Sequence, residues 1–117
     1  MEALLADRAD AMFHALADRT RRDILRRVMT EGLSVSDLAS GYDMSFAAVQ
    51  KHVAVLERAG LISKQRVGRE QRARAEVDAI RSVSALLDEL EEQWRSRVQR
   101  IDDLLAAEEL ESNRSTR

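Results

Sequence analysis

The chain has 117 residues, enough for one compact domain with its own core and too few for two. Hydrophobic residues make up 44% of it and charged residues 34%, a balance typical of a folded globular protein. It has no cysteine, which excludes disulfides, iron–sulfur clusters and thiolate zinc sites.

The formal net charge of -2 conceals an uneven distribution of charge along the chain. Residues 45–75 carry seven basic and two acidic side chains, whereas residues 76–111 carry four basic and eleven acidic ones. A basic segment within an acidic chain indicates a binding surface for a polyanion, although an unevenly charged solvated surface is the alternative. Acids and arginines near the N-terminus argue against a signal peptide, and no apolar run reaches membrane-spanning length, so a cytoplasmic protein with no membrane partner is expected.

The first half of the chain reads as short helices joined by tight turns. Thr20 and Ser34 each precede an aspartate by three residues, a pattern typical of helix N-caps. This predicts helices over 20–31 and 35–40, with Gly32 ending the first of them in a left-handed conformation.

A third helix follows a four-residue turn. Ser45 is its expected N-cap, and the helix is predicted over 45–59. Its apolar face carries residues spaced three and four apart, namely Phe46, Val49, Val53 and Leu56. Two helices joined by a tight glycine-containing turn indicate a helix-turn-helix motif.

The segment 61–75 is predicted to be a β-hairpin, with its turn at Gly68. In the second strand Arg72 and Arg74 share one face, and the small side chains of Ala73 and Ala75 share the other.

A long helix is predicted over 77–110, followed by a frayed tail at 112–117. Its apolar residues follow a near-heptad pattern that so small a domain cannot cover alone. The stripe must therefore pack on another chain, on the N-terminal helix, or on both, and a homodimer is the simplest solution. The expected dimer interface consists of Leu5, Phe13, Ile80, Val83, Leu87, Leu90, Trp94, Ile101 and Leu104.

The segments 15–25 and 44–62 resemble the ArsR-type winged helix-turn-helix repressors, and the resemblance extends over residues 11–75. It implies a mainly α fold of about five helices and a two-stranded β-wing, as a single domain over 1–111 that dimerises through its terminal helices. Metal-sensing members carry paired cysteines where this chain has Ser34 and Ser36, and the C-terminal helix has no histidine. We therefore expect no metal and no cofactor.

The resemblance also implies the residues that contact DNA. A recognition helix enters the major groove, where Gln50 pairs with adenine and the methyls of Ala47 and Ala48 meet thymine methyls. Ser45 and Lys51 are expected to hold phosphate oxygens. For His52, contact with a phosphate and local packing both stay open. The expected wing contacts either track the DNA backbone or enter the minor groove, through Arg66, Arg69, Arg72 and Arg74. For Arg21 and Arg22, contact with the DNA backbone and pairing with nearby acids both stay open.

The sequence therefore predicts a homodimeric repressor that binds near-palindromic double-stranded DNA, and it specifies no effector. An enzyme is not expected, because no cysteine nucleophile, phosphate-binding loop or histidine–carboxylate pair at a useful spacing is present. Two alternatives remain open, a dimeric protein-interaction adaptor and a non-specific architectural DNA binder.

Overall fold

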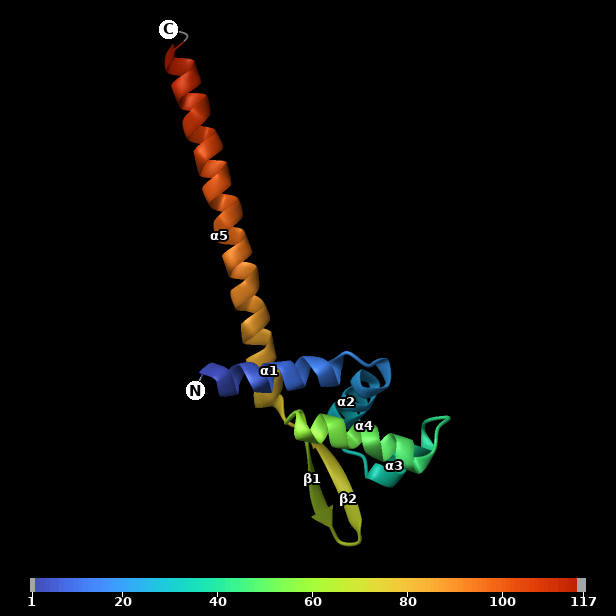
Figure 1. Ribbon diagram of the computed structural model, residues 1–117. Coiled ribbons are helices and arrows are strands. Elements are labelled where there is room, and N and C mark those ends of the chain that lie inside the picture. The colour runs from blue at the N-terminus through green and yellow to red at the C-terminus, as the bar shows by residue number, and fades with distance from the viewer. Residues whose placement is uncertain (1, 116–117) are drawn as a thin grey trace. The chain divides into compact units, whose positions relative to one another are not determined.

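The computed structural model describes residues 2–115, and the side chains of residues 6–114. The elements are α1 (Glu2–Leu16), α2 (Arg19–Glu31), α3 (Val35–Ser40), α4 (Phe46–Arg58), β1 (Ile62–Val67), β2 (Glu70–Ala75) and α5 (Val77–Ser115), as Figure 1 shows. The predicted fold of five helices and a two-stranded wing is confirmed. The chain divides between Val83 and Ser84 into two compact units, where one domain over 1–111 was expected.

Helix α2 begins earlier than its capping pattern suggested. Asp18, and not Thr20, is the N-cap, because its carboxylate accepts a hydrogen bond from the Arg21 amide at 3.0 Å. This bond is the main reason why the pKa of Asp18 lies below its usual value. Asp23, the expected second half of a capping box at Thr20, is used elsewhere in the fold.

The other predicted helix boundaries follow from local chemistry. Gly32 ends α2 with φ at 56°, a left-handed conformation that glycine adopts without steric cost. The predicted N-caps Ser34 and Ser45 are confirmed, since their hydroxyls accept hydrogen bonds from the Asp37 and Ala48 amides.

A polar cluster fixes the turn between α3 and α4 to helix α2. The Tyr42 hydroxyl donates to the Asp23 carboxylate at 2.5 Å, and the Arg27 guanidinium lies 5.1 Å from the centre of the Tyr42 ring. Arg27 also donates to the Leu38 carbonyl at 3.4 Å. The guanidinium occupies the space beside Gly41, where an added Cβ would lie 2.6 Å from Arg27 Nη1.

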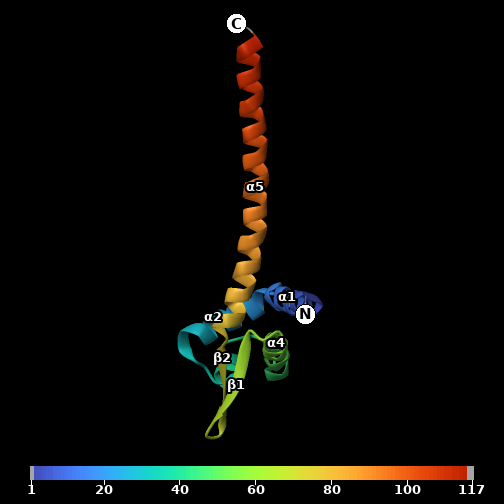
Figure 2. The ribbon, with the colours of Figure 1, turned by 90° about the vertical axis from the view of Figure 1, so that its left-hand side faces the viewer.

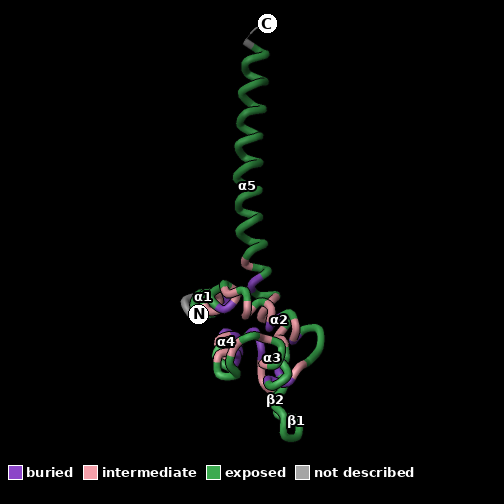
Figure 3. The backbone as a smooth tube through the Cα atoms, turned by 90° about the vertical axis from the view of Figure 1, so that its right-hand side faces the viewer, coloured by how far each residue is buried: buried purple, intermediate pink, exposed green. Residues whose placement is uncertain are grey.

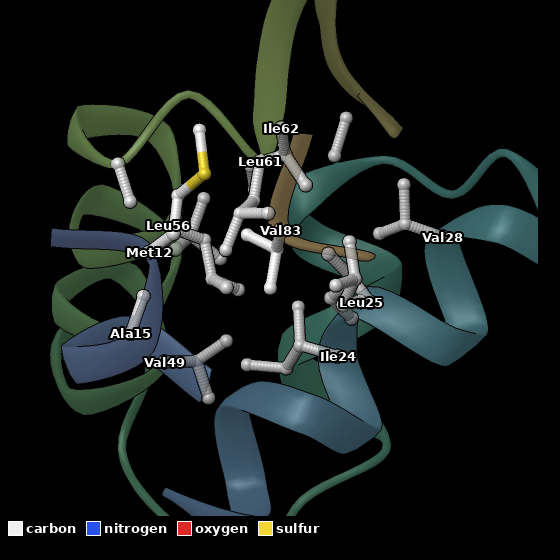
Figure 4. Close-up of a cluster of buried hydrophobic side chains, with 14 residues drawn as sticks. Met12, Ala15, Ile24, Leu25, Val28, Val49, Leu56, Leu61, Ile62 and Val83 are labelled. Carbon is white, nitrogen blue, oxygen red and sulfur yellow. The ribbon is translucent and has the colours of Figure 1, made fainter. Parts of the chain in front are cut away.

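The hydrophobic core lies between α1, α2, α3, α4 and the base of the hairpin (Figure 4). Its fully buried side chains include Ile24, Leu38, Leu56, Leu61, Ile62, Val49 and Val53. Phe46 was expected on this apolar face, and that expectation is wrong because the residue is 48% exposed. Tyr42 and Met44 from the preceding turn pack against the core instead.

The hairpin pairs Ile62 with Ala75 and Val67 with Glu70, leaving Gly68 and Arg69 as a two-residue turn. Gly68 has φ at 64°, whereas Arg69, like every other non-glycine residue that the structure describes, has no positive φ, and this sign pattern fits a type II′ turn. At its base, the Ala73 amide donates to the Leu33 carbonyl at 3.0 Å, so β2 is attached to the loop before α3. Figures 1 and 2 show the hairpin extending from the side of the helices opposite α1.

Helix α5 extends further than predicted, through Ser115, because residues 112–115 contain no glycine or proline to end it. A frayed tail was expected over 112–117; α5 includes residues 112–115 of it, and residues 116 and 117 lie outside the described part of the chain. Figure 3 shows that the helix after residue 86 is exposed throughout its described length.

The expected dimer-interface residues fall into three groups. Val83 is 8% exposed and belongs to the core of its own chain, and Ile80 packs against that core. Phe13 is exposed, and the side chain of Leu5 lies outside the described residues. The exposed members on α5 are Leu87, Leu90, Trp94, Ile101 and Leu104, together with Val98 and Leu105, which the heptad assignment missed.

Replacing Tyr42 with Phe should lower the free energy of unfolding by about 1 kcal/mol, because the part-buried Asp23 carboxylate loses its hydroxyl donor. Burial, and then the hydrogen bond to Asp23, raise the pKa of Tyr42, so the folded state favours the protonated phenol. The protonated phenol therefore contributes to the free energy of unfolding at every pH below about 10, the pKa of tyrosine in the unfolded chain. This contribution is lost as the pH rises through the higher pKa of Tyr42 in the folded protein.

Urea unfolding at pH 7 and above pH 10 measures both effects. The difference between wild type and Tyr42→Phe should shrink at the higher pH. Ser40→Ala is the matched control, since it removes an exposed hydroxyl bond in the same region and should change stability by less than about 0.5 kcal/mol. Equal stability of wild type and Tyr42→Phe at pH 7 would show that the hydrogen bond from Tyr42 to Asp23 does not stabilise the fold.

Candidate nucleic-acid interface

The exposed side of α4 carries most of the residues predicted to meet DNA. Ala47, Gln50 and Lys51 are exposed, whereas Ala48 is half-buried. The Ser45 hydroxyl accepts the Ala48 amide hydrogen as the N-cap, which leaves its own hydrogen free to be donated. Three of the predicted residues of α4 are therefore exposed, and a fourth, Ser45, serves as the N-cap of the helix.

Two exposed residues of α4 were missed in the sequence. Arg58 is exposed and lies seven residues after Lys51, on the same side of the helix. Its helical spacing could have identified it. Phe46 is also exposed, but its spacing from Val49 and Val53 points to the core, so periodicity gave the wrong answer for it.

His52 is turned toward its own chain. Its Nδ1 lies 3.4 Å from Arg21 Nη1 and 3.9 Å from the Asp18 carboxylate. Nδ1 of the ring therefore faces the guanidinium of Arg21 and the carboxylate of Asp18 within the chain. His52 thus joins the middle of α4 to the start of α2, and Nε2 is the ring nitrogen that these contacts leave unoccupied.

Arg21 and Arg22 bind carbonyl groups at the end of α1. The Arg21 guanidinium donates to the Ala15 and His14 carbonyls at 2.7 and 2.9 Å, and Arg22 donates to the Leu16 carbonyl at 2.8 Å. The last carbonyls of a helix lack partners within the helix, and the negative end of its dipole favours cations. Both guanidinium groups are therefore engaged by backbone carbonyls of the chain.

The four arginines of the wing do not share one face. Directly paired residues of an antiparallel ladder lie on the same face, and the register pairs Gln65 with Arg72 and Ser63 with Arg74. Arg66 is paired with Gln71 and lies on the opposite face, which at its base carries the buried Ala73. Arg69 occupies the turn. The wing therefore presents cations in three directions.

Most of the positive charge of residues 45–75 is not neutralised within the chain. Glu57 lies 3.8 Å from Lys64, joining α4 to β1, and Glu70 lies 3.7 Å from Arg72. Within the described residues, the remaining cations of this segment form no ion pair, namely Lys51, Arg58, Arg66, Arg69 and Arg74. The recognition helix and wing thus carry an excess of exposed positive charge, as phosphate binding requires.

The positions where metal-sensing relatives carry cysteines have a structural use here. Ser34 is 5% exposed and caps α3, while Ser36 is exposed. Over residues 2–115, no group of three or more histidine, cysteine, aspartate or glutamate side chains is placed to hold a metal ion. No helix in this range is both long enough and apolar enough to cross a membrane.

Comparisons with known proteins agree with this architecture. The family model of a helix-turn-helix domain matches residues 16–65. The uncharacterised HTH-type transcriptional regulator YuzN of Bacillus subtilis (strain 168) is 42% identical over 67 residues, which is 51% of this chain and 73% of YuzN.

Solved structures extend the likeness over most of the chain. An ArsR-like transcriptional regulator from Rhodococcus sp. RHA1 is 30% identical, with a TM-score of 0.77, covering 85% of this chain and 93% of that one. The crystal structure of another ArsR family transcriptional regulator is 35% identical, with a TM-score of 0.73, covering 78% of this chain and 94% of that one. A homodimeric winged helix-turn-helix DNA-binding domain from Mycobacterium bovis, 24% identical with a TM-score of 0.64 over 78% of this chain and 85% of its own, shares the fold.

A capped recognition helix, a two-stranded wing and unpaired cations on both define a DNA-binding transcriptional regulator of the winged helix-turn-helix class. Within that class, the chain belongs to the ArsR family, and it is a member without the metal-sensing cysteines.

Proposed function

We propose that the protein is a homodimeric repressor that binds a near-palindromic DNA operator and is not controlled by a metal. The observation that carries this proposal is the set of unpaired cations on the exposed sides of α4 and the hairpin, around a recognition helix whose start is capped. Repression then follows from occupancy, because the bound dimer blocks access to the promoter.

Each exposed group has a role that its chemistry suits. The Gln50 amide pairs with adenine, and the Ala47 methyl allows a close approach to the groove floor. Lys51 and Arg58 bind phosphates along the helix, while Arg69 and Arg74 bind the backbone from the wing. Arg72 joins them only if it leaves Glu70, because the pair is exposed and weak.

The exposed apolar residues of α5 support dimer formation. Leu87, Leu90, Trp94, Val98 and Ile101 recur at spacings of three and four, which places them on one side of the helix. An apolar stripe of this length is seldom left in water. The Mycobacterium bovis domain of the same fold is homodimeric, which favours a second copy as the partner.

Independence from metal rests on the residues at the positions where relatives sense it. Ser34 is buried and engaged as a cap, and a neutral hydroxyl is a poor ligand for soft metals. Repression is therefore expected to persist when arsenite or zinc is added.

Selection of duplexes from a random DNA pool tests the proposed function. The selected duplex and a scrambled one are then titrated at two salt concentrations. A near-palindromic duplex bound about 10³-fold more tightly than the scramble supports the repressor. Equal binding of both that collapses with salt supports an architectural binder, and absence of binding at low salt supports an adaptor.

Replacing Lys51 or Arg69 with Ala should weaken binding to the operator and to the scramble alike. Each change removes a phosphate contact, so the slope of log K against log salt should fall by about one per protomer. Arg22→Ala is the matched control, since its guanidinium is held by the Leu16 carbonyl, and it should leave this slope unchanged. A slope unaltered by Lys51→Ala would remove that residue from the interface.

Replacing Gln50 with Ala should relax the preference at one base pair of each half-site. The loss of a bidentate contact with adenine costs about 1–3 kcal/mol at that pair and little elsewhere. Binding to all single-base variants of the operator measures this profile. If the profile of Gln50→Ala matched that of wild type, base reading by Gln50 would be wrong.

Replacing Leu90 with Asp should shift the protein from dimer to monomer, because a charge then lies within the apolar stripe. Sedimentation velocity measures the change. The single tryptophan, Trp94, is 64% exposed in one chain, so its fluorescence should shift to the red as the dimer dissociates. Ser96→Asp is the control on the far side of the helix, and a monomeric wild type would contradict the stripe as an interface.

A further inference from the structure

Phe46 occupies a position that a core residue would normally fill. It is the first residue of α4 and lies three residues before Val49, which is fully buried. Yet nearly half of its surface is open, because Tyr42 and Met44 already pack against the core at this end. An aromatic ring is thus left on the surface in the first turn of the recognition helix.

The neighbours of Phe46 are residues already assigned to base contacts. Gln50 lies four residues further on, so the two side chains are adjacent along one side of the helix. Ala47 is exposed beside them and too small to cover the ring. The first turn therefore presents an apolar ring, a methyl and an amide, in the part of a recognition helix that meets base edges.

This combination fits the chemistry of an A·T pair. In the major groove, adenine presents an acceptor and a donor that match a glutamine amide, while thymine presents a C5 methyl. Among the standard bases of DNA only thymine carries that methyl, and phenylalanine is one of the side chains that contact it.

We propose that Phe46 is a specificity-determining residue that contacts thymine methyls next to the adenines bound by Gln50. The proposal rests on the proposed function, since it requires α4 to enter the major groove. It gives the operator a chemical signature, namely A·T pairs at the positions facing the first turn of α4. Uracil at those positions lacks only the methyl and loses this contact alone, whereas cytosine also changes the hydrogen-bonding groups that the base pair presents in the major groove.

Replacement of single thymines by deoxyuridine in the selected operator tests this contact without altering the protein. Uracil keeps the pairing edge of thymine and lacks only the methyl. Wild type should lose about fourfold in affinity for each half-site at one thymine position, the effect of burying about one methyl group. In Phe46→Ala the same substitution should have no effect, while other thymines keep their effects.

Phe46→Leu and Met29→Ala complete the design. Leucine preserves an apolar contact, so Phe46→Leu should retain part of the uracil penalty, and its melting temperature checks folding. Met29 is an equally exposed apolar residue in α2 with no assigned role, so Met29→Ala should keep the full penalty.

The outcomes separate the two proposals. If wild type binds its operator specifically but tolerates uracil at every thymine, the role of Phe46 is overturned and the repressor stands. The same holds if Phe46→Ala keeps the uracil penalty of wild type. If wild type selects no operator, the proposed function itself fails.

Discussion

The position of the recognition helix depends on α2, which holds it through polar contacts at two places. Asp18 and Arg21 at the start of α2 face His52 in the middle of α4. Further along α2, Asp23 and Arg27 contact Tyr42, which lies in the turn between α3 and α4. Hydrophobic packing alone is non-directional, so these directed contacts restrict how α4 can rotate over the core. A base-reading helix needs such restriction, because displacement by a fraction of an ångström weakens bidentate hydrogen bonds.

Arginine has several different uses in this chain, and its abundance alone says little about DNA binding. Arg21 and Arg22 satisfy carbonyls at the end of α1, and Arg27 covers the ring of Tyr42. The planar, permanently charged guanidinium suits these part-buried contacts, where several donors are needed at once. The arginines of the wing make no such contacts with carbonyls, and three of them form no ion pair in the described chain. Structural arginines are therefore distinguished from the arginines proposed to face DNA by their contacts within the chain, and not by their charge.

Local signals predicted most of the fold. The caps at Ser34 and Ser45, the left-handed Gly32 and the turn at Gly68 each depend on one residue's own chemistry, which a sequence displays directly. The start of α2 was misplaced because Thr20 and Asp18 both suit an N-cap, and the choice depends on the partner that Asp23 finds nineteen residues away. Such a tertiary contact has no local signature.

The candidate site was predictable to the same degree. Helical and strand periodicity predicts which side chains point away from the core, and it identified Gln50, Lys51 and the wing arginines as exposed. The register of the hairpin was needed to show that Arg66 lies on the opposite face from Arg72 and Arg74. Periodicity failed at Phe46, because it takes no account of the preceding turn, from which Tyr42 and Met44 already pack against the core at the start of α4.

The basic segment over residues 45–75 and the acidic helix α5 differ in how their charges are paired. The basic segment keeps its charge because only Glu57 and Glu70 lie within it, and each is paired with one neighbouring cation. The acids of α5 accompany an apolar stripe and pair partly within the helix, as Arg95 does with Glu91 and Gln99 with Asp103. An acidic helix is repelled by phosphate, so an apolar stripe on it favours a protein partner over DNA. The charge pattern of the chain thus favours nucleic acid at the basic segment and a protein partner at α5, as the proposed dimeric regulator requires.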